Sequence, residues 1–206
     1  MYTAEEKKLI NYTRKKVKEL FIGFPAPAHG IDHVTRVAEL ARLIAVEEKA
    51  NVFLSEMSGW LHDIGRTMES GTSLITSHAE LSYELCRKWF KEDKVLCGGL
   101  TKQQKLVILY SVRYHWNNVA DEYPEAWVLR DADKIDTLGL IGIRRAREFS
   151  GGNEKQFQMD LRLRYDIFYW LKTKTAKKIV KERQLMEQLD HFYFNYLRKM
   201  VKSVEL

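Results

Sequence analysis

Apolar residues recur with helical spacing along nearly the whole chain, and this period constrains the fold more than any other feature. In one segment an apolar stripe runs through Val34, Val37, Ala38 and Ala41, which is the spacing of an amphipathic helix. We find no convincing strand, internal repeat, low-complexity tract or domain linker. The sequence therefore predicts an all-α fold in a single domain over residues 1–206.

Capping and breaking residues indicate where the helices begin and end. Thr3 and Glu6 have the spacing of a capping box, as do Ser77 with Glu80 and Thr101 with Gln104. Asp32 is a further candidate cap, and glycine and proline residues separate the periodic segments. We expect about seven to nine helices. The predicted helical segments are about 3–21, 32–44, 52–64, 77–90, 101–115, 125–149 with a bend around 137–142, 160–171 and 175–202.

The composition excludes several classes of protein. A chain of 206 residues with 45% hydrophobic residues and only 3 prolines is neither disordered nor fibrous, and it can bury a substantial core. Cys86 and Cys97 have no metal-type spacing, so we expect free thiols in a reducing compartment. The first residues are charged, and no apolar stretch approaches the roughly 18 residues that span a bilayer. We expect a cytoplasmic protein without a membrane partner.

The net charge of +6 allows two kinds of partner. A basic protein can attract phosphorylated small molecules to a site, or it can bind nucleic acid over a surface. The basic residues are spread along the chain, and the densest run, from Lys172 to Arg183, also carries apolar positions at helical spacing. That run is typical of a solvated helix face. We therefore favour a nucleotide or another phosphorylated small molecule as the partner, and nucleic acid is the alternative.

Metal-competent side chains are distributed around a histidine-aspartate doublet. The doublet, His62 and Asp63, lies near the end of a predicted helix. Neutral imidazoles and carboxylates are ligands for hard or borderline divalent cations, and no thiol is placed to compete with them. The doublet alone is common, but further candidate ligands lie before and after it in the chain: His33, His78, His115 and Asp133.

Three strings carry a resemblance to a known family. They are HGIDHVTRVAELA at 29–41, GWLHDIGR at 59–66 and VLRDADKIDTLGLIGIRRA at 128–146, and the segment at 171–188 is similar as well. On these strings the chain resembles the HD superfamily of metal-dependent phosphohydrolases, in particular the bacterial branch that includes nucleotide pyrophosphohydrolases. The resemblance implies a compact helical domain with a motif core at about 29–149 and C-terminal helices, about 157–202, packed on it.

The resemblance also implies a set of metal ligands: His33, His62, Asp63 and Asp133. Two imidazoles and two carboxylates leave positions on an octahedral ion for water and substrate oxygens. This suits Mn²⁺, Mg²⁺, Co²⁺ or Fe²⁺ better than a closed structural zinc site.

Two of these ligands have neighbours that compete with them. His29 is an alternative to His33, and the family pattern favours the second of the two. Asp131 and Asp136 are alternatives to Asp133, and the pattern again favours Asp133. Asp136 would then orient a ligand or a neighbouring lysine from behind.

His78 and His115 decide between two versions of the site. Members of the superfamily with two metals have histidines in comparable intervals, whereas single-metal members use residues there to contact phosphate or to donate protons. We favour one metal per chain, with His78 and His115 as catalytic residues and with His115 also contacting the substrate. Tyr114 and Trp116 flank His115, and both core packing and base stacking are open to them. His191 lies outside any motif, and we expect it on a helix surface.

Cations near the predicted ligands are candidates for phosphate binding. Arg66 follows the doublet, Lys134 follows Asp133, and Arg36 lies one turn from His33. Such groups can neutralise the charge on the non-bridging oxygens of a phosphoryl group. We assign Arg66 and Lys134 to both catalysis and substrate binding, and Arg36 to substrate binding.

The predicted function is metal-assisted hydrolysis of a phosphate ester or anhydride in a nucleotide. The metal is expected to acidify water and polarise the phosphoryl group, and an imidazole can protonate the leaving oxygen. The resemblance adds that a nucleoside triphosphate is cleaved with release of pyrophosphate. The alternatives are a nucleotide phosphomonoesterase or phosphodiesterase, and an inactive module of the same fold that binds nucleotide or nucleic acid.

Overall fold

The computed structural model describes residues 2–24, 27–69 and 77–204. These residues form helices and no strands, which confirms the all-α prediction. The α-helices are α1 (Ala4–Leu20), α2 (Ile31–Glu47), α3 (Val52–Leu61), α4 (His78–Glu92), α5 (Lys94–Gly99), α6 (Lys102–Tyr114), α7 (Pro124–Ile135), α8 (Gly139–Phe149), α9 (Glu154–Tyr169), α10 (Lys174–Glu182) and α11 (Leu185–Val204). Two short 3-10 helices, η1 (Pro27–His29) and η2 (Ile64–Met68), complete the set.

The eleven α-helices of the described residues exceed the seven to nine that we expected. Asp93 accepts hydrogen bonds from two backbone amides and so begins the short α5, which the apolar pattern did not indicate. The predicted helix at 125–149 is two helices, with Gly139 at a φ of 61° where α8 begins. The predicted helix at 175–202 is also divided, at Gln184 with a φ of 52°. A single residue in the left-handed region, at the end of α10 or at the start of α8, divides a predicted helix without disturbing the apolar period on either side of it.

The predicted caps are confirmed in part. Thr3 and Thr101 form complete capping boxes, whereas the Ser77 hydroxyl accepts from the Glu80 amide without the reciprocal bond. The prediction for Asp32 was wrong. α2 begins at Ile31 with Gly30 as its N-cap, two residues earlier than a cap at Asp32 requires. Asp32 lies in the first turn, where its negative charge interacts favourably with the helix dipole.

α2 lies at the centre of the helices that surround the candidate site. One side of it packs on α3, which in turn packs on α1 and α6, in a shared core that includes Val34 and Leu61. The other side packs with α7 and α10 around Val37. α2 and α3 approach closely because residue 59 is glycine: a Cβ there would lie 2.6 Å from Cα of Ala38. This contact brings the beginning of α2 near the end of α3.

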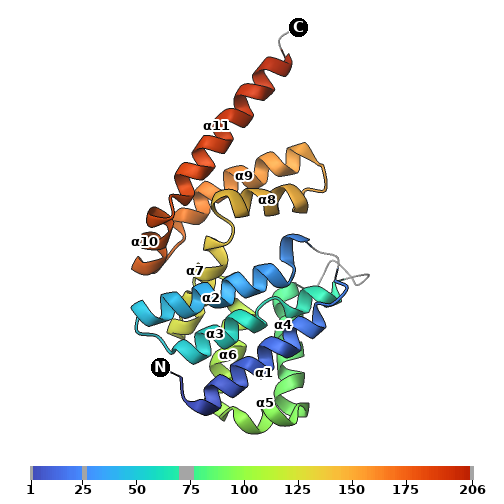
Figure 1. Ribbon diagram of the computed structural model, residues 1–206, viewed down its shortest axis with the longest axis vertical. Coiled ribbons are helices and arrows are strands. Elements are labelled where there is room, and N and C mark those ends of the chain that lie inside the picture. Colours follow the sequence, from blue (N-terminus) through green and yellow to red (C-terminus); the bar gives the residue numbers. More distant parts are fainter. Residues whose placement is uncertain (1, 25–26, 70–76, 205–206) are drawn as a thin grey trace.

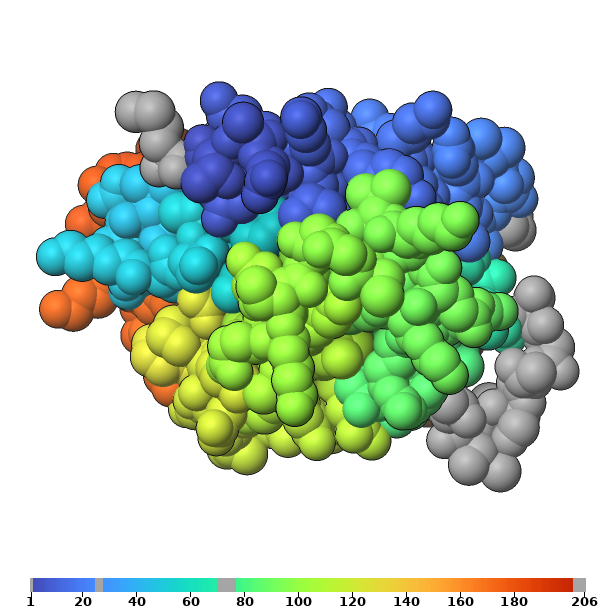
Figure 2. Space-filling model, turned by 90° about the horizontal axis from the view of Figure 1, so that it is seen from below, coloured from blue at the N-terminus to red at the C-terminus, as the bar shows by residue number. Residues whose placement is uncertain are grey.

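The C-terminal helices occupy one end of the molecule. α8 and α9 pack together and against α11, which extends beyond them (Figure 1). Their shared core includes Phe157, Leu161 and Leu189. At the other end, α1 lies against the segment that contains α5 (Figure 2). Both cysteines are free, Cys86 buried and Cys97 exposed. No helix within the described residues has the length and apolar character needed to cross a bilayer.

Candidate metal centre

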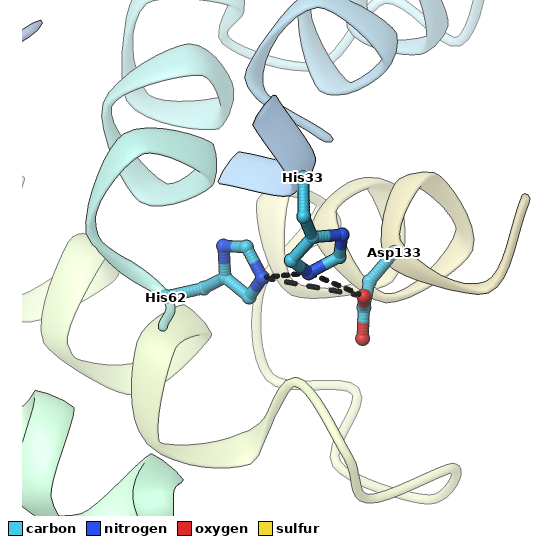
Figure 3. A group of neighbouring side chains, drawn as sticks. All are labelled: His33, His62 and Asp133. Carbon is cyan, nitrogen blue, oxygen red and sulfur yellow. Dashed lines mark hydrogen bonds and ion pairs between the residues drawn. The ribbon is translucent and has the colours of Figure 1, made fainter. Parts of the chain in front are cut away.

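Three side chains from three helices meet in a first donor group: His33 near the start of α2, His62 at the C-cap of α3, and Asp133 in α7 (Figure 3). Nε2 of His33 lies 3.2 Å from Nε2 of His62 and 3.4 Å from Oδ1 of Asp133. Nε2 of His62 lies 4.0 Å from the same oxygen. The ligand atoms are close enough to share one cation.

A second donor group consists of Asp63, His78 and His115. Asp63 precedes η2, His78 is the first residue of α4, and His115 is the C-cap of α6. The two imidazoles face each other through Nε2 at 3.2 Å. Oδ1 of Asp63 lies 3.6 Å from Nε2 of His78 and 4.0 Å from Nε2 of His115.

Asp63 stands between the two donor groups. Its Oδ2 lies 3.5 Å from Nε2 of His33 and 3.8 Å from Nε2 of His62, while its Oδ1 faces the second group. Oδ1 is buried and has no hydrogen-bond partner within the described part of the chain. An ionised oxygen in that position is costly unless a positive charge satisfies it. Asp63 is therefore placed to serve a cation in each group.

The hydrogen bonds behind the imidazoles determine which nitrogen faces the site. Nδ1 of His62 donates to the Gly59 carbonyl at 2.8 Å, and Nδ1 of His115 donates to the Val112 carbonyl at 2.7 Å. A carbonyl oxygen can only accept, so in the neutral ring Nε2 carries the lone pair. His62 in the first donor group and His115 in the second therefore each direct an Nε2 lone pair into the site. Cations fit this arrangement, since they occupy such open acceptors.

Comparison with known proteins gives the family of the chain. The sequence profile of the HD domain matches residues 30–138, which is more than half of the chain. The chain belongs to the HD domain family. A protein of Bacillus subtilis, YpgQ, is 26% identical over 184 residues, covering 85% of this chain and 84% of its own length. Ribonuclease Y of Syntrophomonas wolfei is 28% identical over 113 residues, but these cover only 19% of that larger protein.

Solved structures share the whole fold. The crystal structure of YpgQ in complex with ADP has a TM-score of 0.65 and 23% identity, and the alignment covers 98% of this chain and 97% of that one. An HD-superfamily hydrolase of Bacillus thuringiensis has a TM-score of 0.70 at 19% identity and covers 95% and 98%. At these identities the likeness concerns the fold, so the roles of the side chains rest on the geometry of this chain.

A buried network holds His33 of the HD domain from behind. Nδ1 of His33 lies 2.7 Å from Oδ2 of Asp136. The same carboxylate accepts from Arg36 at 2.5 and 3.0 Å and from Arg145 at 2.9 Å. Arg145 also donates to the Ala28 carbonyl at 2.6 Å. Asp136 thus has the orienting position that the sequence suggested, and Arg36 pairs with Asp136 rather than facing the HD doublet.

Burial and neighbouring charges shift the pKa values of the donors. Burial lowers the pKa of His62 to about 4 and that of His78 to about 4, against the opposing effect of Asp63. Burial also disfavours charge on His33, but its bonds to Asp136 and Asp63 outweigh this and raise its pKa. The pKa of Asp63 is well below its usual range, because His62, His33 and Arg66 together outweigh the effect of burial. Ionised carboxylates and neutral imidazoles are the forms that bind metals.

Gly65 brings the two donor groups together. A Cβ at this position would lie 2.3 Å from the Ser82 amide and 2.6 Å from the His78 carbonyl, and both contacts are with backbone that cannot move aside easily. The Gly65 amide donates to the Ser82 hydroxyl at 2.9 Å. Only glycine allows η2 to pack on the first turn of α4 this closely. The HD doublet is thereby held beside His78.

A cavity of about 310 Å³ adjoins the second donor group. Arg66 and His78 form the wall nearest the donors, and residues of η1, α8 and α9 form the remainder, together with Thr137 between α7 and α8. Arg66 is half-buried, with Nε 3.4 Å from Oδ2 of Asp63. Another cavity of similar volume lies between α2, α8 and α11, and its lining includes Arg36 and Asp136 but no member of either donor group.

The other candidate residues are placed as follows. His29 lines the first cavity, with its ring 5.9 Å from that of His33, and burial lowers its pKa to about 3. Lys134 donates to the Asn118 side chain, and burial lowers its pKa to about 8. His191 lies exposed on α11, as expected.

Asp131 has a structural role. It is fully buried and accepts hydrogen bonds from the backbone amides of Lys172 and Thr173 and from the Thr173 hydroxyl. It therefore holds the connection between α9 and α10 and is not part of either donor group.

Three residues near the site were missed by sequence reasoning. Arg145 lies in the string that carries the family resemblance, and its position there was the available signal. Phe149 and Asp160 line the cavity from α8 and α9, yet their local sequence contains nothing that sets them apart. Tyr114 and Trp116, the aromatic residues that we did consider, do not line it.

Proposed function

We propose that this HD-domain chain is a divalent-metal-dependent phosphohydrolase that acts on a nucleotide and releases pyrophosphate from a nucleoside triphosphate. The observation that carries the proposal is the Asp63 carboxylate, with one oxygen toward each pair of imidazoles. Phosphoryl transfer benefits from cations on both sides of the reacting group. The fold shared with YpgQ, which was crystallised with ADP, supports a nucleotide as the ligand.

The donor set fits two ions per chain, and we propose two where the sequence led us to expect one. His33, His62, Asp63 and Asp133 would hold one ion, and Asp63, His78 and His115 would hold the other. Imidazole and carboxylate donors without a thiol suit Mn²⁺, Fe²⁺, Co²⁺ or Mg²⁺. When bound, such ions supply Lewis acidity toward a phosphoryl group and lower the pKa of water.

The surrounding residues have separate tasks in this proposal. Arg66 lines the cavity beside Asp63 and can donate to non-bridging phosphate oxygens. His78 and His115 act as ligands rather than as proton donors, because their Nε2 atoms face each other at 3.2 Å beside Oδ1 of Asp63. Lys134, with a pKa of about 8, stays mostly protonated at that pH and adds positive charge near Asp133. The free thiols fit a reducing compartment, and we place the reaction in the cytoplasm.

The test is a panel of nucleotides assayed with Mn²⁺, Mg²⁺ and Co²⁺, with pyrophosphate and orthophosphate measured separately and bound metal counted per chain. We expect nucleoside triphosphates to yield monophosphate and pyrophosphate in equal amounts. Asp63→Ala supplies the background in the same preparation. Release of orthophosphate alone, or no turnover above the Asp63→Ala background with any metal, would overturn the proposal.

A phosphodiesterase is the second candidate, and the second donor group is the observation that favours it. The partial similarity to proteins named ribonuclease Y points the same way, although the matched segment is about a fifth of such a protein. Linear and cyclic dinucleotides in the same panel separate the two candidates. A module that binds RNA without turnover would instead show binding that weakens steeply as salt rises.

A further inference from the structure

The cavity beside the second donor group has two chemically different ends. Near the donors it is polar and basic, with Arg66 beside Asp63. Its far wall is formed by α8 and α9, where Phe149 and Leu163 are 59% and 43% exposed. Large apolar side chains left open to a cavity that also contains charged groups indicate a ligand with both kinds of surface.

Phe149 is held within reach of the metal centre by two successive ring contacts. The Phe149 ring lies 5.8 Å from that of His29, at an interplanar angle of 76°. The His29 ring lies 5.9 Å from that of His33 in the first donor group. An edge-to-face contact of this kind covers at most one face of the Phe149 ring, and 59% of the residue is exposed. The His29 ring therefore links the aromatic wall of the cavity to the first donor group.

Asp160 distinguishes the far wall from a phosphate site. It lies on α9 among the residues that line the cavity, and its carboxylate accepts from the Gln156 amide at 3.1 Å. A carboxylate repels phosphate but accepts hydrogen bonds from hydroxyl and amino groups. Arg145 and Arg164 also line the cavity, but Arg145 is paired with Asp136 and Arg164 donates to the carbonyls of Asp160 and Gly142. The far wall thus offers an aromatic face and an acceptor, which match a base and a ribose rather than a phosphate chain.

We propose that Phe149 is a specificity-determining residue on which the nucleobase of the substrate stacks, with Asp160 beside the nucleoside and the phosphates directed toward Arg66. This inference rests on the proposed function for its choice of ligand. It goes further because it assigns recognition of the nucleobase to the wall formed by α8 and α9. Binding at that wall would distinguish a nucleotide from inorganic polyphosphate, which has no base. Stacking on an aromatic side chain is tolerant of base identity, so all four common nucleotides bind.

The test compares Phe149→Ala with the wild type, using ATP as the substrate and inorganic tripolyphosphate as a competitive inhibitor without a base. Loss of stacking on one base raises the KM for ATP by roughly fivefold to 100-fold. The inhibition constant of tripolyphosphate stays within about twofold, because it does not reach Phe149. Phe149→Trp restores the KM, since any large aromatic ring provides the same face. The control is Phe194→Ala on α11, where the side chain is also exposed and lines no cavity of the site.

The outcomes separate this inference from the proposed function. Suppose that the wild type hydrolyses ATP. If Phe149→Ala then leaves the KM for ATP unchanged, or weakens the binding of ATP and of tripolyphosphate equally, Phe149 does not bind the base. Absence of nucleotide hydrolysis in the wild type contradicts the proposed function alone. In that case calorimetry can compare the binding of ADP to the metal-loaded wild type and to Phe149→Ala. Equal affinities for ADP, or no binding to either protein, would overturn the role of Phe149 in stacking the base.

Discussion

The two donor groups share Asp63 but are held differently. In the first group, His33 is bound from behind by Asp136, which two arginines hold in turn. In the second group, the His78 side chain is 23% exposed at the cavity, and no described residue bonds its Nδ1. A ligand whose orientation is fixed by an outer partner binds its metal more tightly. We therefore expect the first group to retain an ion more tightly than the second, which lies at the cavity.

Removal of Asp63 should affect both groups at once and have the largest effect. We expect Asp63→Ala to lose both ions and to lower turnover on the order of a thousandfold or more. Metal analysis and steady-state kinetics measure this, and circular dichroism shows whether the helix content persists. Asp32→Ala, which removes an exposed carboxylate from α2, is the control. Full activity in a metal-loaded Asp63→Ala protein would contradict a central role for this carboxylate.

Single histidine variants separate the two groups. We expect His62→Ala to lose the tightly held ion of the first group. We expect His115→Ala to lose only the ion of the second group, so that the number of metal ions bound per chain falls from two to one. Loss of a residue that only holds a ligand from behind costs about tenfold in activity or more. His115 is proposed as a ligand itself, so we expect turnover of His115→Ala to fall by at least that much. A wild type with one ion, and a His115→Ala variant that keeps it, would restore the single-metal site that we first expected.

The support behind His33 gives a third test. We expect Asp136→Asn to lower the affinity of the first ion by about 10- to 100-fold and to leave the second ion less affected. Calorimetric titration with the metal, at a temperature where the variant is folded, measures the dissociation constants of both ions. Arg36→Lys keeps a positive charge beside the Asp136 carboxylate and is the matched control. Equal weakening of both ions would mean that Asp136 stabilises the fold and does not support one group.

Lys134 tests whether charge next to the first group assists catalysis. We expect Lys134→Ala to lower turnover by less than the roughly 100-fold that loss of a direct transition-state donor costs, because the amine pairs with Asn118. Both ions should remain bound. Loss of metal in this variant would show that Lys134 supports Asp133 rather than the substrate.

Asp131 should show the smallest effect on activity, although it lies two residues from a ligand. Asp131→Ala leaves buried donors of Lys172 and Thr173 without an acceptor, so we expect the free energy of unfolding to fall by about 1–3 kcal/mol. Metal content and turnover should stay within about twofold of the wild type at a temperature where the variant is folded. Chemical denaturation and metal analysis measure the two effects. Loss of an ion would place Asp131 in the metal centre.

The three aspartates of the DADKID segment show where sequence reasoning ended. Successive residues on a helix differ in direction by about 100°, so these three side chains cannot all face one ion. The family pattern favoured Asp133, and the structure places it in the first donor group. It also directs Asp136 to the rear of His33 and Asp131 to the start of α10. Helical spacing predicts that they diverge, but the partner of each depends on which helix lies opposite.

The amino-acid sequence by itself determined the helical content, most of the helix starts and the types of side chain that could bind a metal. These follow from the apolar period and from caps, which act between residues a few positions apart. Only the tertiary structure decided that His78 and His115 face each other beside Asp63, and that Phe149 lines the cavity. Those distances depend on the packing of α4 against α6 and η2, where Gly65 permits the contact, and on the position of α8 beside η1. Coordination joins residues that are distant along the chain, and no local pattern records how closely their helices approach.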